Sequence, residues 1–230
     1  MKKLFVMLVA ALILPNLYAK KPLTLFLVGD ETMAELTQPE DITDSAAVGW
    51  GQMLPKFLPA DAVVENHAVD GATTKSFMDE GQWQEVMARV KRGNTLMIQF
   101  GHHEYDEEDY RHYTTLEFFE NNLLQMIKEA QKKHLRIVLL TPTAKNFFKD
   151  DVLYPRHGGY AEGVRRVAAH THLPLIDIDA LTTALIEIKG ADGAAVYFAA
   201  GDTIRLNEEG AKTVAKMVVQ AAKEQKIKGF

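Results

Sequence analysis

The sequence predicts a single domain of three layers, α/β/α, around a mostly parallel sheet of five strands. Two features indicate this fold. Residues 23–28 (LTLFLV) form an unbroken apolar run, which is typical of a strand buried on both faces of a parallel sheet. Along the rest of the chain, short apolar runs alternate with segments of helical periodicity, as they do in proteins whose strands and helices build one sheet.

The other predicted strands are short and mostly apolar. A brief second strand is expected at residues 62–65 and a third at residues 95–100 (TLMIQF). The fourth, residues 136–141 (RIVLLT), ends at the proline that follows it, because proline lacks the N–H that a sheet ladder requires. The fifth is expected at residues 173–178 (LPLIDI). Ligands of such sheets bind beyond the carboxyl ends of the strands, so the segments after these strands are candidates for function.

Four segments show the apolar spacing of helices. They are residues 83–90, 116–132, 160–170 and 208–226. In the last of these, apolar residues three and four positions apart form one face, and Asn207 is placed to cap the start of the helix. We therefore expect helices on both faces of the sheet.

The first residues have the layout of a secretory signal peptide. Two lysines precede an apolar run over residues 4–14, and residues 15–19 (PNLYA) end in a small residue. The run is too short to cross a hydrocarbon core of roughly 30 Å, which argues against a membrane anchor. The sequence predicts cleavage after residue 19, export to the periplasm or beyond, one domain over residues 20–230, and no membrane contact after cleavage.

The composition excludes several classes of function. Lys+Arg number 26 and Asp+Glu number 31, and the net charge of −5 argues against broad electrostatic binding of nucleic acid. The chain has no cysteine, which excludes disulfides, thiolate metal sites and a cysteine nucleophile. An exported chain without cysteine fits a Gram-negative periplasm better than a disulfide-rich extracellular setting.

Four segments that follow predicted strands or precede the last helix share a recognisable order. They are residues 28–34 (VGDETMA), 66–77 (NHAVDGATTKSF), 99–104 (QFGHHE) and 201–211 (GDTIRLNEEGA). This order and spacing resembles the SGNH (GDSL-type) hydrolases, and within them the rhamnogalacturonan acetylesterase branch of exported enzymes that remove acetyl esters from pectic sugars. The resemblance covers nearly the whole chain after residue 19. It implies a polysaccharide or oligosaccharide partner, pectic in the first instance.

The resemblance also implies roles for particular positions. In that family a Ser of the first segment attacks the ester, and a His three residues after an Asp in the last segment removes its proton. Backbone N–H groups and an Asn side chain of the third segment stabilise the oxyanion. In this sequence Glu31 stands at the nucleophile position, Arg205 at the base and His103 at the Asn. The orienting Asp remains, as Asp202. The other motif residues of the expected pocket are Asp30, Asp70, Gly71, His102 and Glu104.

These substitutions remove the ordinary chemistry. Glu31 has no proton for a base to remove, and a guanidinium such as Arg205 stays protonated and cannot act as a base. The Ser-His-Asp esterase cycle is therefore predicted to be absent. We expect a salt bridge between Glu31 and Arg205, with Arg205 also held by Asp202. The leading hypothesis is an inactive or glycan-binding homologue.

Two alternatives retain catalysis. A glycoside hydrolase or lyase of altered mechanism would use carboxyl groups from Glu31, Glu104 and Asp202. A nearby Arg lowers a carboxyl pKa, so Glu31 suits a base or nucleophile, and Glu104 or His103 an acid. The third hypothesis is residual carbohydrate esterase activity, with Thr32 as a shifted nucleophile.

Metal binding and other aromatic or histidine sites are less favoured. His102, His103, Glu104 and Glu31 are ligand types, but adjacent side chains on an extended backbone diverge, so no metal and no cofactor are predicted. His102 is then expected to make structural hydrogen bonds. The histidines without a motif partner, among them His157, are expected on the surface or in packing. The two tryptophans are expected to pack, with sugar stacking by the first as an alternative.

Overall fold

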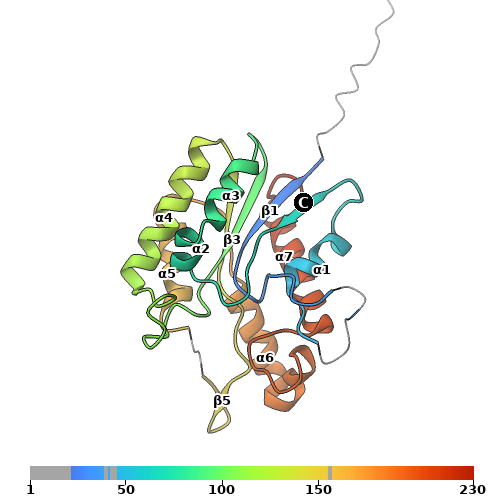
Figure 1. Cartoon of the computed structure of the whole chain (residues 1–230). Coiled ribbons are helices and arrows are strands. Elements are labelled where there is room, and N and C mark those ends of the chain that lie inside the picture. The colour runs from blue at the N-terminus through green and yellow to red at the C-terminus, as the bar shows by residue number, and fades with distance from the viewer. Residues whose placement is uncertain (1–21, 39–40, 42–45, 155–156) are drawn as a thin grey trace, which may run out of the picture.

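The central sheet has five parallel strands in the order β2-β1-β3-β4-β7, which confirms the predicted fold class (Figure 1). The computed structural model describes residues 22–38, 41, 46–154 and 157–230, and the predicted signal peptide lies outside them. The strand bounds are β1 Thr24–Gly29, β2 Val63–Asn66, β3 Thr95–Gln99, β4 Arg136–Leu140 and β7 Leu175–Ile176.

The composition of a strand agrees with its place at the centre or at an edge of the sheet. Strands β1 and β3 lie inside the sheet, and every residue of both except Thr24 is buried. Strand β2 lies at an edge, has no fully buried residue and contains Glu65 and Asn66. An unbroken apolar run therefore marks a central strand, and a mixed run marks an edge.

Strand β7 is shorter than predicted because Asp177 serves a helix instead. The Asp177 side chain accepts a hydrogen bond from the N–H of Ala180 at 3.1 Å and so caps α6 (Ile178–Ala194). The expected strand over residues 173–178 is thereby limited to Leu175–Ile176.

The predicted helices are all present within one or two residues at each end. They are α3 (Gln82–Arg89), α4 (Leu116–Lys132), α5 (Tyr160–Thr171) and α7 (Glu208–Glu224). The Asn207 side chain accepts from the N–H of Gly210 at 3.0 Å and caps α7, as predicted. Short helical elements and a hairpin complete the chain: α1 (Trp50–Met53), η2 (Leu54–Phe57), α2 (Thr74–Asp79), β5 (Phe148–Lys149), β6 (Val152–Leu153) and η3 (Ala195–Tyr197).

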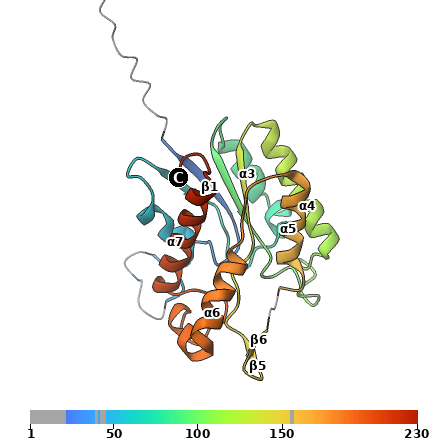
Figure 2. The same ribbon diagram turned by 180° about the vertical axis from the view of Figure 1, so that it is seen from behind.

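The helices cover the sheet in two layers, each with its own apolar core. Helices α2, α3, α4 and α5 lie on one face, and α1, α6 and α7 lie on the other (Figures 1 and 2). Phe26 and Val28 of β1 pack toward the first layer, whereas Leu25 and Leu27 pack toward the second. Among the described helices, none combines the length and apolar character that a membrane crossing needs.

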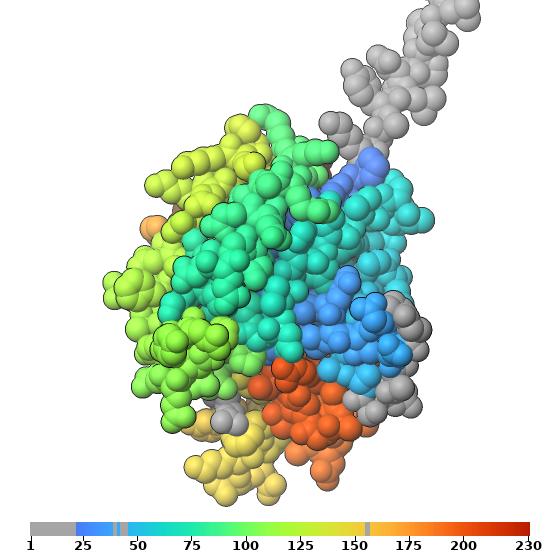
Figure 3. Space-filling model, in the orientation of Figure 1, coloured from blue at the N-terminus to red at the C-terminus, as the bar shows by residue number. Residues whose placement is uncertain are grey.

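The carboxyl ends of β1, β3 and β4 meet at one edge of the sheet because the strands are parallel. The segments that follow β1 (blue) and β2 (teal) adjoin the orange-red segment before α7 on the surface in Figure 3. Residues that are distant in the sequence therefore gather at this edge, as the resemblance requires.

Candidate functional site

The turn after β1 carries two buried carboxylates. Asp30 and Glu31 are both 0% exposed. The carbonyl of Asp30 accepts from the N–H groups of Met33 and Ala34, both at 3.1 Å, which makes the turn tight. Gly29, which precedes the turn, allows β1 to pack closely against β3, because a Cβ at this position would lie 2.5 Å from the carbonyl oxygen of Gln99.

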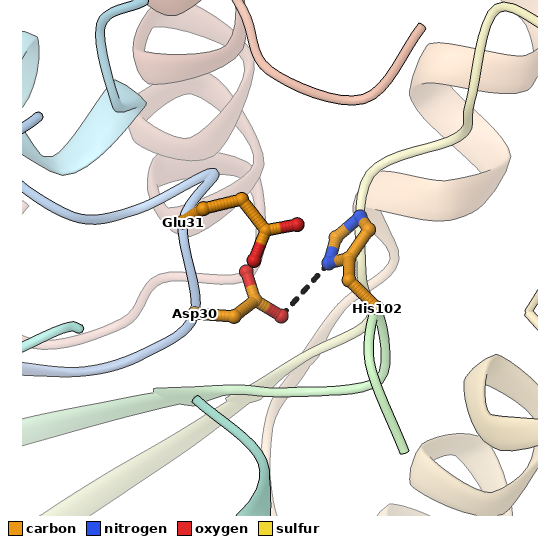
Figure 4. Close-up of side chains that lie close together, drawn as sticks. All are labelled: Asp30, Glu31 and His102. Carbon is orange, nitrogen blue, oxygen red and sulfur yellow. Dashed lines mark hydrogen bonds and ion pairs between the residues drawn. The ribbon is translucent and has the colours of Figure 1, made fainter. Parts of the chain in front are cut away.

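Asp30 is a fully bonded structural acceptor. Its Oδ1 accepts from Thr32 Oγ1 at 3.0 Å and from Gln99 Nε2 at 3.4 Å. Its Oδ2 lies 2.8 Å from Nδ1 of His102 (Figure 4). Every oxygen of this carboxylate therefore has a donor, which is how a buried charge is tolerated.

His102 has the structural hydrogen-bonding role that the sequence suggested. Its Nδ1 faces Asp30, and its Nε2 lies 3.0 Å from the carbonyl oxygen of Thr143. Burial lowers the pKa of His102, but the charge and hydrogen bond of Asp30 outweigh it and raise the pKa on balance. An imidazolium donates through both nitrogens and fits both partners.

Glu31 contacts His103 and not Arg205. Nε2 of His103 lies 2.9 Å from Oε2 of Glu31, although the ring N–H does not point along the contact and neither Glu31 oxygen has an aligned donor. Burial alone would raise the pKa of Glu31, but the contact with His103 and the charges of both histidines lower it to about 2. The lowered pKa favours an ionised Glu31, and Glu31 in turn raises the pKa of His103 against the effect of burial, which favours an imidazolium beside it.

Arg205 pairs with two other carboxylates, so the expected salt bridge between Glu31 and Arg205 is wrong. Nη2 of Arg205 lies 2.8 Å from Oδ1 of Asp70, and Nη1 lies 3.5 Å from Oδ2 of Asp202. The expected contact with Asp202 is confirmed. Burial lowers the pKa of Arg205, but Asp70 and then Glu31 raise it on balance, so the Glu31 charge still acts on it.

The loops that carry Asp70 and Asp202 position these two carboxylates beside Arg205. Asp202 Oδ1 accepts from the N–H groups of Ile204 at 2.7 Å and Arg205 at 3.0 Å, which fixes the turn before α7. The Asp70 side chain is half exposed, and Gly71 next to it has a φ of 73°, a conformation that favours glycine. Asp70 is therefore a half-exposed ion-pair partner of Arg205.

Glu104 is a buried support for α2. Its Oε1 accepts from the N–H of Thr74 at 3.0 Å, and its Oε2 accepts from the N–H of His103 at 3.3 Å. It is 0% exposed, and burial raises its pKa to about 7. The carboxyl group fastens the start of α2 to the loop after β3 and does not reach the surface.

The site contains a group of metal-ligand type. Ligand atoms of Asp30, Glu31 and His102 lie within 4.8 Å of one another (Figure 4). Both oxygens of Asp30 and both nitrogens of His102 already take part in hydrogen bonds, so only Glu31 has free ligand atoms. This donor set fits a network of ion pairs better than a metal ion.

Trp50, Lys145 and His157 complete the surroundings of the site. The indole N–H of Trp50 donates to Gln99 Oε1 at 2.6 Å and the ring is 0% exposed, which excludes sugar stacking. Lys145 donates from Nζ to the carbonyl of His102 at 3.2 Å, and the ring of His157 lies 5.2 Å from that of His102. Lys145 lies in the segment after the carboxyl end of β4. Since ligands of parallel sheets bind beyond these strand ends, its position in the sequence could have identified it as a candidate.

Comparison with known proteins gives consistent matches. The model of the GDSL-like lipase/acylhydrolase family matches residues 27–213. A rhamnogalacturonan acetylesterase of Bacillus subtilis is 29% identical over 219 residues, covering 89% of this chain and 91% of the relative. One from Emericella nidulans is 25% identical, covering 91% and 87%. The crystal structure of the B. subtilis protein YxiM superposes with a TM-score of 0.81 at 26% identity, covering 91% of this chain and 58% of that protein.

Proposed function

The chain belongs to the GDSL-like lipase/acylhydrolase family, and we propose that it is a non-esterase member that binds a pectic polysaccharide or oligosaccharide without removing acetyl groups. The family match bears out the resemblance seen in the sequence. The relatives from B. subtilis and E. nidulans are rhamnogalacturonan acetylesterases, which supports a carbohydrate ligand.

The proposal that esterase activity is absent is supported by the residues at two positions. At the position that the sequence resemblance assigns to the Ser nucleophile stands Glu31, a carboxylate that is 0% exposed and paired with His103. At the base position stands Arg205, which is bound to Asp70 and Asp202. A buried carboxylate and a guanidinium cannot perform proton removal and nucleophilic attack on an ester.

A glycan-active enzyme of altered mechanism is the second candidate. Two carboxyl groups with pKa values displaced in opposite directions are typical of an acid/base pair, and Glu31 and Glu104 have values of about 2 and about 7. Both groups are 0% exposed, however, and Glu104 holds two backbone N–H groups. Since an acid or base must reach the bond that it cleaves, burial favours the non-catalytic function.

The test is a parallel assay of turnover and binding on the purified protein. Acetate release from acetylated rhamnogalacturonan and from p-nitrophenyl acetate measures esterase activity, and reducing-end release measures glycosidic cleavage. Affinity electrophoresis on acetylated and de-acetylated pectic fragments measures binding. Binding without turnover is expected, and acetate release that disappears with Thr32→Val would establish a residual esterase instead.

We also propose export through residues 1–19. The charged start, the apolar run over residues 4–14 and the small residue at position 19 support this step. Mass spectrometry of the protein from the periplasm or medium should show an N-terminus at Lys20. A mature chain that retains residues 1–19 would contradict the proposal.

A further inference from the structure

A small cavity lies beside the candidate site, between the β5–β6 hairpin and α6. The hairpin projects from the sheet next to α6 (Figure 2). The volume of the cavity is about 140 Å³, and its lining includes Lys145, Leu153, Tyr154, His157, Asp179 and Glu187. This volume is roughly ten times the space that one water molecule needs, and it is below the ~300 Å³ at which pockets for drug-sized ligands begin. The cavity therefore suits a single small molecule.

Lys145 makes one part of the cavity wall positive. The residue is 4% exposed, and its Nζ donates to the carbonyl of His102 at 3.2 Å and to Tyr105 Oη at 3.3 Å. Both acceptors are uncharged, and the described residues place no carboxylate oxygen within 4.0 Å of this nitrogen. The ring of Tyr105, 4.6 Å from Nζ, stabilises the charge only in part. One of the three N–H donors remains free, and a buried cation without a counter-ion is costly.

His157 is a second polar group that can serve a ligand. It is 4% exposed, and neither ring nitrogen has an aligned hydrogen-bond partner. Burial, with the positive charges of His102 and Lys145, holds the pKa of His157 well below its ordinary value. The ring is therefore neutral and offers one donor and one acceptor.

The α6 side of the cavity is negative. Asp179, Thr183 and Glu187 line it at intervals of four residues, which places them on one face of α6. Oδ2 of Asp179 accepts from Arg165 at 2.7 Å, whereas Oδ1 lies 3.6 Å from Nε2 of His157, too far for a hydrogen bond. Burial raises the pKa of Asp179 although Arg165 opposes the shift, so a further cation would stabilise the carboxylate.

The hairpin supplies the apolar wall. Leu153 is half-buried, and Tyr154 is 53% exposed. A short aliphatic side chain can bury its surface against these two residues.

The two charges of the wall select the charges of the ligand. A simple anion would pair with Lys145 but would be repelled by Asp179 and Glu187, and a simple amine would meet the opposite problem. A molecule that carries one charge of each sign satisfies both parts of the wall.

We propose that this cavity binds a free amino acid with a short apolar side chain, with its carboxylate on Lys145 and its ammonium group on Asp179. His157 donates a second hydrogen bond to the carboxylate, and Leu153 and Tyr154 contact the side chain. This site goes beyond the proposed glycan function and does not depend on it.

Isothermal titration calorimetry with L-leucine, 4-methylpentanoate and 3-methylbutylamine tests the proposal. The second compound is leucine without its ammonium group, and the third is leucine without its carboxylate. We expect leucine to bind at least tenfold more tightly than either of the other two. Absence of leucine binding, or equal affinity for leucine and either analogue, overturns the proposal.

Variants assign each charge of the ligand to its partner. Lys145→Met keeps the length of the side chain without its charge and should remove the preference for leucine over 3-methylbutylamine. Asp179→Asn should remove the preference for leucine over 4-methylpentanoate. Each variant should weaken leucine binding at least tenfold.

Glu162→Gln is the matched control, because Glu162 is a second carboxylate bound to Arg165, at 3.2 Å, and it is not part of the cavity wall. This variant should bind leucine as wild type does. If Lys145→Met does not fold, Asp179→Asn and the ligand series on wild-type protein decide. Unchanged leucine affinity in a folded Lys145→Met or Asp179→Asn protein overturns the inference.

The outcome is separate from that of the proposed function. Protein that binds pectic fragments but not leucine would refute only the amino-acid site. Acetate release from acetylated pectin by protein that binds leucine would refute only the non-esterase function.

Discussion

Glu31 and His103 contact each other across the carboxyl ends of two neighbouring strands, with 2.9 Å between Oε2 and Nε2. The family resemblance assigns these positions to the nucleophilic Ser and the oxyanion Asn. A buried carboxylate at position 31 requires a cation, and a histidine at position 103 provides it. The two side chains therefore depend on each other physically, and Arg205 pairs instead with Asp70 and Asp202.

The Glu31–His103 pair should make folding stability depend on pH. The lowered pKa of Glu31, about 2 against 4.5, adds stability that is present above pH 4.5 and lost as the pH falls toward 2. Burial lowers the pKa of His103, but Glu31 raises it on balance above 6.5, so that contribution is present below pH 6.5 and lost as the pH rises through the raised pKa. The pair is most stabilising between pH 4.5 and 6.5.

Urea unfolding across this pH range measures the effect. The His103→Asn variant should lose stability mainly between pH 4.5 and 6.5 and differ least from wild type at high pH. His170→Asn replaces an exposed histidine at the end of α5 and serves as the control. A His103→Asn profile parallel to that of wild type would contradict the pairing.

Restoring the family residues should restore esterase activity. The triple variant Glu31→Ser, His103→Asn and Arg205→His introduces the residues that the resemblance assigns to the nucleophile, the oxyanion donor and the base, beside the existing Asp202. We expect p-nitrophenyl acetate hydrolysis to rise by on the order of 100-fold or more above wild type, because triad members act as a unit. The variant that keeps Glu31 and carries only the other two changes should stay inactive. A folded triple variant without activity would show that the backbone has moved away from the esterase geometry.

Glu104 should act on stability and not on catalysis. The pKa of Glu104 is about 7 in the folded protein, against an ordinary value of 4.5. The protonated carboxyl group therefore stabilises the fold fully below pH 4.5, and this stabilisation is lost as the pH rises through 7. Glu104→Gln cannot ionise, so the unfolding free energy of this variant should change less than that of wild type between pH 4.5 and 8. The difference should reach up to about 3 kcal/mol, at about 1.4 kcal/mol per pKa unit. Glu107→Gln, exposed in the same loop, is the matched control. Any glycan cleavage that Glu104→Gln abolishes would support the altered enzyme.

Trp50 should stabilise the fold without touching the ligand. Trp50→Phe removes the N–H that bonds to Gln99 and should lower the unfolding free energy by about 1–3 kcal/mol. Affinity for pectic fragments should not change. Trp83→Phe loses a comparable bond, to Glu129 at 2.6 Å, on the opposite layer. A tenfold loss of affinity in Trp50→Phe alone would mean that the indole contacts sugar.

Local patterns were sufficient to predict the regular core. Helix α4 matches the predicted residues 116–132 because its apolar face and its cap at Thr115 are both local features. Helix α6 was not predicted, since its apolar residues are spread around the helix and Gly190, with a φ of 69°, interrupts it. Helix α2 was missed because six residues are too few for a periodic signal, although Thr73 and Ser76 form a capping box.

The sequence by itself determined the family and the central strands, and it showed which residues stand at the positions that the resemblance assigns to catalysis. Only the tertiary structure decided which charges meet: Glu31 with His103, and Arg205 with Asp70. The physical reason is that motif spacing brings loops to one edge of a parallel sheet, whereas the partner of each side chain depends on loop direction and burial, which the linear pattern does not encode.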